Sequence, residues 1–247
     1  MQNVQLLIHG QSVDASNQAT FERISPIDGT VATKAAAATL EDVDRAIDSA
    51  QQAFKVWSKL SPTERRLRLL KAADLMDQKT EQFIQTGMQE TGSTATWYGF
   101  NVHLAANMLR EAAAMTTQID GSLIPSDVPG NLAMGVRVPC GVIVGIAPWN
   151  APVILATRAL AMPLACGNTV VLKASEACPA THRLIGEVLH EAGLGDGVVN
   201  VITHAAEDAP QIVERLVSHP AVKRINFTGS TKVGKIIAET AAKYLKP

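Results

Sequence analysis

The sequence has no surplus of charge of either sign. Its 22 lysines and arginines nearly balance its 23 aspartates and glutamates, which gives a formal net charge of −1 over 247 residues. Domains that bind nucleic acids usually carry clustered basic charge, so nucleic acid is not an expected partner. The hydrophobic content of 47% and the charged content of 18% are those of an ordinary globular protein with a large core.

Long apolar runs are also missing. The most apolar region, residues 151–167, is interrupted by Arg158 and by two prolines, whereas a membrane helix needs about 20 predominantly apolar residues. The first ten residues lack the basic start and apolar stretch of a signal peptide. The three cysteines are odd in number and have no paired spacing, which favours a reducing compartment over a disulfide framework. We therefore expect a cytoplasmic protein that does not contact membranes.

Patterns for metal binding and for the common dinucleotide loop are absent too. The six histidines show no metal-ligand spacing, so no metal site is expected. Cys140 and Cys178 have no neighbouring base, and Cys166 lies in a small apolar run, so we expect three inert thiols. Residues 145–150 cover the end of a strand-like run and the turn after it. They lack the pattern G-x-G-x-x-G, so a pyrophosphate cannot bind there in the usual way.

The N-terminal region, residues 1–140, combines short strands with helices. Thr39 begins one helix, and the capping box at residues 61–64 begins a second. A third helix is expected over residues 94–117 because of its apolar spacing. Strand-like segments are expected at residues 4–9, 21–24 and 136–138, the last of them inside a connecting arm with three prolines.

The second region, residues 141–247, alternates strand-like and helical patterns. The strand-like runs are residues 141–147, 169–173, 198–202 and 224–227, and the helical stretches are residues 153–166, 179–192, 207–218 and 231–245. This βαβ alternation predicts an α/β fold with a doubly wound, Rossmann-like parallel sheet that forms the nucleotide-binding core. The chain ends after a helix, where a further strand would be expected, so we expect the domain to be truncated at its C-terminus.

A candidate phosphate site lies where the last of these strands turns into a helix. Gly229 allows a close approach of the backbone, and Ser230 offers a hydroxyl beside the free N–H groups of the helix start. Gly234 allows the helix to pack tightly. An ordinary strand–helix turn with a serine cap explains the segment equally well when it is taken alone.

Two charged residues follow the second strand of the core. In doubly wound folds an acidic group at this place binds the adenosine ribose. Glu176 can accept from both ribose hydroxyls while Lys173 donates, and its charge would repel a 2′-phosphate, which favours NAD over NADP. The alternative is an exposed Lys–Glu turn without a ligand.

Asn150 follows the buried run at residues 141–147 and can stabilise a substrate oxygen that becomes negative. Its alternative is a helix N-cap. Arg158 lies two helical turns further on, either on the same face or as a solvent-facing or ion-paired side chain. Trp97 and Tyr98, on the predicted third helix, are of a type more often found in a core than against a ligand.

Taken in order, four segments resemble the aldehyde dehydrogenase superfamily. The resemblance covers essentially the whole chain and includes the N-terminal strands and residues 61–65. The matching segments are residues 139–150, 165–176, 195–201 and 227–231. Within the family the sequence looks most like enzymes for aromatic aldehydes of the salicylaldehyde kind.

The resemblance implies NAD-dependent oxidation of an aldehyde to a carboxylic acid through a cysteine thiohemiacetal and thioester. It places the oxyanion donor at Asn150 and the ribose-binding pair at Lys173 and Glu176. It also implies a pyrophosphate turn at Gly229 and Ser230 and a segment that lines the cofactor, namely Ile146, Ala147, Pro148 and Trp149.

The chain departs from the family at two places. Residues 203–209 lack the glycines that many relatives have after the third strand, so no cofactor contact is expected there. The nucleophilic cysteine and the general-base glutamate belong to motifs that follow residue 247, so we expect this chain to lack the catalytic domain and to be inactive alone. For the substrate we expect an aromatic wall from Trp97 and a cation from Arg158 near Asn150.

The resemblance also implies a homodimer or homotetramer whose subunits pair largely through C-terminal residues. Two other functions remain open from the sequence. One is a non-catalytic nucleotide-binding or structural protein with the same fold. The other is an aldehyde dehydrogenase for an aliphatic semialdehyde.

Overall fold

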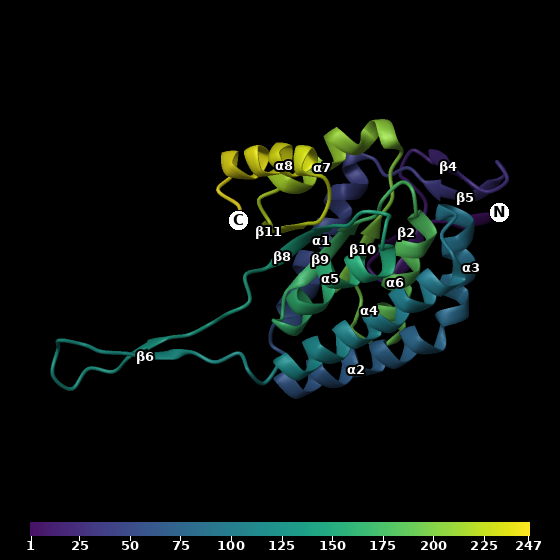
Figure 1. Ribbon diagram of the computed structural model, residues 1–247. Coiled ribbons are helices and arrows are strands. Elements are labelled where there is room, and N and C mark those ends of the chain that lie inside the picture. The colour runs from purple at the N-terminus through teal and green to yellow at the C-terminus, as the bar shows by residue number, and fades with distance from the viewer.

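Two fully buried strands form the centre of the parallel part of a six-stranded sheet in the computed structural model, which describes residues 1–247 (Figure 1). They are β8 (Val142–Ile146) and β9 (Thr169–Lys173), and each is buried at all five positions. Strands with both faces buried need apolar residues throughout, which explains the unbroken β-branched runs. The strands β10 (Val199–Ile202) and β11 (Val222–Phe227) flank the pair. These four parallel strands follow the order β11-β8-β9-β10, which confirms the doubly wound α/β fold.

The sheet is mixed, because N-terminal strands extend it on the β10 side. β2 (Leu6–Ile8) pairs antiparallel with β10, and β3 (Gln11–Val13) pairs antiparallel with β2. The strand predicted over residues 4–9 is therefore found at residues 6–8, and only its bounds are wrong, since Val4 ends β1 (Gln2–Val4) of a different sheet. That three-stranded sheet has the order β1-β5-β4 and contains β4 (Thr20–Ile24) and β5 (Val31–Ala36).

Helices cover both faces of the central sheet. One core joins Ile143 of β8 to residues of α2 (Pro62–Gln78), α4 (Ala95–Met115), α5 (Pro152–Ala165) and α6 (Pro179–Glu191). The other core joins Val142 and Val144 to residues of α1 (Leu40–Trp57), α7 (Ala209–Ser218) and α8 (Thr231–Lys243). Successive β8 side chains thus enter opposite cores, as the period of a strand requires.

The predicted helix start at Thr39 and the predicted capping box at Ser61 are confirmed, and Thr39 forms a capping box as well. The sequence reasoning missed α3 (Thr80–Thr91), which follows α2 after Lys79 alone and has no side-chain cap. Gly87 of α3 lies against α4 so closely that a Cβ atom there would meet the Tyr98 ring at 1.9 Å. Predicted helix 207–218 begins at residue 209, after the 3-10 turn η1 (Ala206–Asp208).

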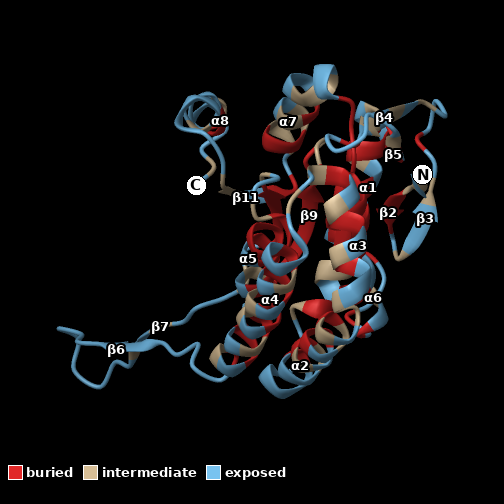
Figure 2. Cartoon of the chain, turned by 45° about the vertical axis from the view of Figure 1, so that its right-hand side comes forward, coloured by how far each residue is buried: buried red, intermediate tan, exposed pale blue.

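A hairpin projects from the body of the molecule as a long ribbon (Figure 1). It contains β6 (Ser122–Ile124) and β7 (Ala133–Gly135), and most of its residues are exposed (Figure 2). The predicted strand at residues 136–138 is wrong: pairing stops at Gly135, and Val136 and Val138 are 72% and 76% exposed. No helix combines the length and the apolar composition that crossing a membrane requires.

Candidate functional site

The candidate site lies at the carboxyl edge of the sheet, where the strand order reverses between β8 and β11. Ligands of open α/β sheets bind at such switch points. A hydrogen bond from the Thr228 amide to the Ile146 carbonyl, 3.0 Å long, holds the two strand ends together. The segments that follow β8, β9 and β11 therefore leave the sheet at one edge, and they carry most of the residues that the sequence analysis singled out.

Asn150 lies in the turn between β8 and α5 and is exposed. It does not cap α5: the N-cap residue is Ala151, and no side-chain cap bond forms. Instead its backbone carbonyl accepts a hydrogen bond of 3.1 Å from the indole Nε1 of Trp97, on α4. The Asn150 carboxamide is left free, so it can donate to a ligand oxygen.

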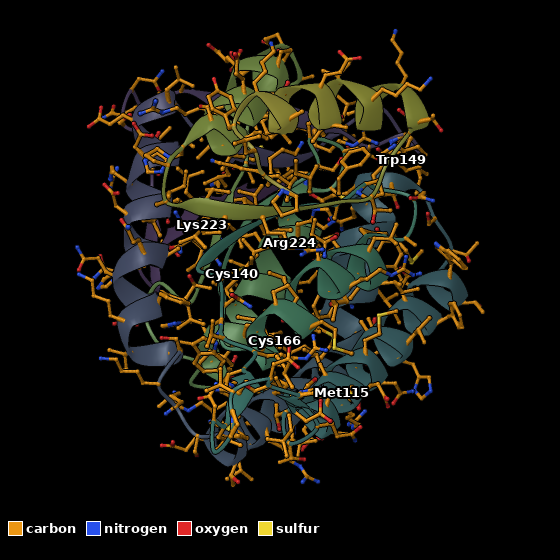
Figure 3. All side chains as sticks on the ribbon, turned by 90° about the vertical axis from the view of Figure 1, so that its left-hand side faces the viewer. Met115, Cys140, Trp149, Cys166, Lys223 and Arg224 are labelled. Carbon is orange, nitrogen blue, oxygen red and sulfur yellow. The ribbon has the colours of Figure 1, made fainter.

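The residues before Asn150 change from buried to exposed within four positions. Ile146 and Ala147 belong to the core, Pro148 is half-buried, and the Trp149 side chain is 52% exposed. Figure 3 shows Trp149 beneath α8, the helix that follows β11. This segment therefore forms a wall of the edge at which the strands end.

Trp97 and Arg158 present their side chains to solvent on the two helices next to Asn150. Trp97 is 39% exposed and stacks on Phe100 with ring centroids 5.6 Å apart, whereas Tyr98 is fully buried in the core. Arg158 is the first exposed residue of α5 after six buried ones. No acidic side chain forms an ion pair with it. Trp97 is thus joined to Asn150, and Arg158 remains an unpaired cation.

Lys173 ends β9 as a buried cation, and it is not the exposed turn residue of the alternative interpretation. Its Nζ lies 2.8 Å from Nε2 of His204, whose Nδ1 lies 2.7 Å from the Ala205 carbonyl. Because a carbonyl only accepts, Nδ1 carries the proton and Nε2 accepts from Lys173. Burial lowers the pKa of Lys173, and the nearby Glu176 carboxylate opposes that shift.

Glu176 is half-buried, three residues after Lys173, and is too far from it for an ion pair. Two of the three Lys173 N–H donors remain unused, since His204 is its one hydrogen-bond partner. The edge after β9 thus offers free donors at Lys173 and an acceptor three residues later at Glu176. Such a pair suits a ligand with neighbouring hydroxyl groups.

The turn between β11 and α8 offers an anion site. The Ser230 hydroxyl caps α8 by accepting from the Val233 amide at 3.3 Å, and its own O–H can still donate. A Cβ atom on Gly229 would meet the Phe227 ring at 2.5 Å, so only glycine fits there. Both residues are exposed. The free amides of a helix N-terminus attract negative groups such as phosphates.

No base was expected beside Cys178, but α6 brings the His182 imidazole to its sulfur. His182 Nε2 lies 3.6 Å from the sulfur, and Nδ1 accepts from the Ser175 amide at 3.1 Å. The proton is therefore on Nε2, so His182 donates to the sulfur and does not act as a base. Burial raises the pKa of the Cys178 thiol and lowers that of His182 to about 3. Cys140 and Cys166 are exposed, free thiols.

Two buried residues that the sequence analysis did not consider support the site. His204 orients Lys173, and Glu90 at the end of α3 caps α6. The Glu90 carboxylate accepts from the amides of Ala180 and Thr181 at 2.8 and 2.9 Å and from the hydroxyls of Thr181 and Thr33. An acid and a histidine far from their partners in the chain leave no local signal, so only the fold reveals these pairs.

Known proteins share both the sequence pattern and the fold of this chain. The pattern of the aldehyde dehydrogenase family matches residues 13–247. Vanillin dehydrogenase from Pseudomonas fluorescens is 65% identical over 247 residues, which are all of this chain and 51% of that protein. Salicylaldehyde dehydrogenase from Pseudomonas putida is 49% identical over 241 residues, or 98% of this chain and 50% of that protein.

Solved structures show the same fold. The crystal structure of a salicylaldehyde dehydrogenase from Pseudomonas putida G7, complexed with salicylaldehyde, matches with a TM-score of 0.98 and 48% identity, over 100% of this chain and 51% of that one. The structure of PnpE in complex with nicotinamide adenine dinucleotide matches with a TM-score of 0.93 and 39% identity, over 100% of this chain and 50% of that one. The chain spans about half the length of the relatives that it matches. From the family pattern, the relatives and the fold, we conclude that this chain belongs to the aldehyde dehydrogenase family.

Proposed function

We propose that this chain forms the coenzyme-binding part of an NAD-dependent aldehyde dehydrogenase that oxidises a hydroxylated aromatic aldehyde to its carboxylic acid. The observation that carries the proposal is the meeting of three segments at one sheet edge. They bring a free carboxamide at Asn150, a donor–acceptor pair at Lys173 and Glu176, and an anion-binding turn at Gly229 and Ser230.

The residues of this edge fit a dinucleotide. Lys173 has two unused donors and Glu176 an unpaired carboxylate, which suit the two hydroxyls of a ribose. Gly229 leaves room for the pyrophosphate to approach the backbone at Ser230, and residues 146–149 line the path toward Asn150. When bound, NAD supplies the acceptor for the hydride of the aldehyde. The Glu176 charge disfavours a 2′-phosphate, so we propose NAD and not NADP.

Asn150 is proposed as the catalytic oxyanion donor of this chain. Its carboxamide would hold the aldehyde oxygen and would strengthen that bond as the oxygen gains charge. The nucleophile is proposed to come from the part of the enzyme that this chain does not span. Cys140 and Cys166 precede β8 and β9, at the opposite edge of the sheet, and Cys178 is a buried thiol of raised pKa. The 247-residue chain is therefore expected to have no dehydrogenase activity alone.

The aromatic substrate is proposed from the relatives and from two side chains. Both the vanillin and the salicylaldehyde dehydrogenase are named for aldehydes with a hydroxylated ring. Trp97 offers a half-exposed indole that is hydrogen-bonded to the Asn150 segment, and Arg158 offers an unpaired guanidinium on α5. An indole suits a flat ring and a guanidinium suits an oxygen substituent.

The experiment that tests the proposal measures NADH formation by the full-length enzyme. The substrates are vanillin, salicylaldehyde, benzaldehyde and an aliphatic semialdehyde, each with NAD and with NADP. We expect the highest kcat/KM for a hydroxylated aromatic aldehyde with NAD. A preference for the semialdehyde would contradict the substrate, and dinucleotide binding without turnover would favour a non-catalytic protein. Glu176→Gln is expected to reduce the preference for NAD over NADP.

We further propose that the enzyme works in the cytoplasm as a homodimer or homotetramer. Three free cysteines without a disulfide are consistent with a reducing compartment. The hairpin supports self-association, since Leu123, Leu132 and Met134 are 75%, 69% and 60% exposed. Exposed apolar surface of this kind marks interaction sites. Light scattering on the purified enzyme tests the oligomer, and a monomer at micromolar concentration would refute it.

A further inference from the structure

A cavity lies at the amino edge of the parallel strands, opposite the candidate site. Its volume is about 430 Å³, which is within the range of ~300–1,000 Å³ for ligand pockets. It is lined by the end of α1, the start of α2, the ends of α4 and α5, and the base of the hairpin. Strands of five residues separate it from the other edge by roughly 16 Å. Figure 3 shows Cys166, which lines the cavity, well away from Trp149.

Arg65 gives this cavity a buried positive charge without an acidic partner. The residue is only 7% exposed. Its Nε donates to the Ala165 carbonyl at 3.0 Å and its Nη1 donates to the Leu60 carbonyl, and no carboxylate forms an ion pair with it. A helix C-terminus such as that of α5 carries about half a negative charge, which offsets the guanidinium only in part. Buried charges in proteins are normally paired, so Arg65 is an exception that calls for an anion.

A second cation lines the same cavity, and no acid does. Arg137, at the base of the hairpin, is exposed and forms no ion pair. Three other cavities have both an arginine and an acidic residue in their lining, namely Arg183 with Glu187, Arg68 with Asp196, and Arg137, on its other side, with Asp120. Of these, Arg183 and Glu187 form an ion pair. The cavity with Arg65 differs from these three because its lining has two arginines and no acid.

The remaining walls favour an anion with an apolar body. Ile119 and Val138 contribute hydrocarbon surface, together with two prolines. The Thr116 hydroxyl is not a free donor, because it already donates to the Ala113 carbonyl at 2.9 Å. Guanidinium groups match the planar geometry of carboxylates with two parallel hydrogen bonds. A small organic acid satisfies both features at once.

We propose that this cavity binds the carboxylate of a small organic acid, which pairs with Arg65 and Arg137 while its apolar body packs on Ile119 and Val138. The inference does not rest on the proposed dehydrogenase activity, because it uses only residues at the opposite edge of the sheet. It adds a second ligand site to the chain.

Binding is tested by calorimetry at low salt with three probes, namely benzoate, its neutral isostere benzamide, and inorganic phosphate. We expect benzoate to bind and benzamide to bind at least tenfold more weakly. Arg137→Gln is expected to weaken benzoate binding at least tenfold, while Arg66→Gln, an exposed neighbour of Arg65 outside the cavity, leaves it unchanged. Absence of benzoate binding, equal affinity in Arg137→Gln, or binding of phosphate alone would each overturn the proposal.

The place of binding is tested by alkylation of cysteines followed by peptide mass analysis. Cys166 lines the cavity, whereas Cys140 is exposed outside it, so each serves as a reference for the other. Burial raises the pKa of the Cys166 thiol, so the labelling is done at alkaline pH. Benzoate is expected to slow the labelling of Cys166 at least threefold and to leave that of Cys140 unchanged. Equal effects on both thiols would place benzoate elsewhere and overturn the assignment.

Discussion

The indole Nε1 of Trp97 donates a hydrogen bond of 3.1 Å to the backbone carbonyl of Asn150, although 53 residues separate the two in the chain. The bond joins α4 to the turn between β8 and α5. Because Asn150 uses its backbone carbonyl for this contact, its carboxamide stays free for a ligand. The proposed aromatic wall therefore also positions the proposed oxyanion donor.

We predict that Trp97→Phe, introduced into the full-length enzyme, lowers kcat by up to about tenfold with benzaldehyde as the substrate. The variant keeps an aromatic ring but loses a hydrogen bond that is worth ~0.5–1.5 kcal/mol. Phe100→Leu serves as the control, since it removes the ring that stacks on Trp97 but leaves the bond to Asn150 in place. Steady-state kinetics measures both variants. Equal losses in the two would contradict a positioning role of the indole N–H.

We predict that Asn150→Ala lowers kcat of the full-length enzyme by ~10²–10³, the usual effect of removing one oxyanion donor. The side chain is exposed and caps no helix, so the melting temperature of the variant should stay close to that of the parent. NADH formation and differential scanning calorimetry measure the two effects. A variant that is fully active would remove Asn150 from the mechanism, and one that unfolds would assign it a structural role.

In the full-length enzyme, Arg158→Ala is expected to lower kcat/KM for salicylaldehyde more than for benzaldehyde, because only salicylaldehyde has a ring hydroxyl for the guanidinium to bind. Arg158 is exposed and forms no ion pair, so its removal should cost the fold little. Vanillin, whose hydroxyl lies elsewhere on the ring, shows whether the position of that group matters. Equal losses for all three aldehydes would argue against specific recognition by Arg158.

The sequence predicted the parallel core well because its signals are local. The run at residues 169–173 is a strand with the predicted bounds, since unbroken β-branched runs between helices have few alternatives. Predictions failed where pairing decides the structure. Val136 and Val138 alternate like a strand, but they lie beyond the last residue of β7 that has a partner in β6.

Part of the candidate site was predictable because it too depends on local signals in the sequence. Asn150, Lys173 and Ser230 each lie at a strand end, and ends of parallel strands meet at one edge. The supporting contacts were not predictable, because His204 lies 31 residues from Lys173 in the chain. The contacts of Glu90 were not predictable either, because it caps a helix that begins about 90 residues later in the chain. Such pairs depend on tertiary packing and leave no periodic signal.

We predict that Glu90→Gln destabilises the protein by about 1–3 kcal/mol, because the amide has one acceptor oxygen where the carboxylate has two. The two Glu90 oxygens accept four hydrogen bonds, two of them from the first amides of α6, so an N–H group of the new amide would face donors. Glu81→Gln, an exposed change on the same helix, is the matched control. Urea denaturation measures both variants. A loss no larger than that of the control would contradict the capping role.

The stability of the protein is expected to fall as the pH drops below about 6.5, because His204 is held neutral in the fold. Burial, assisted by the Lys173 ammonium, lowers the pKa of His204 to about 4. Between pH 6.5 and 4 the unfolded chain binds a proton that the folded protein does not, so the free energy of unfolding decreases by up to ~1.4 kcal/mol per pH unit for this group. His182, with a pKa of about 3, acts in the same direction.

The measurement is urea denaturation at pH 7.5, 6.0 and 5.0. His204→Gln keeps an acceptor for Lys173 but cannot titrate, so it should reduce the pH dependence and leave the part due to His182. His103→Gln, an exposed change on α4, should leave the dependence as it is. If His204→Gln lost stability with pH as steeply as the parent, the pKa of His204 would be the same in the folded and the unfolded protein. In that case burial and the Lys173 ammonium would not hold the imidazole neutral, and the contact proposed between His204 and Lys173 would be contradicted.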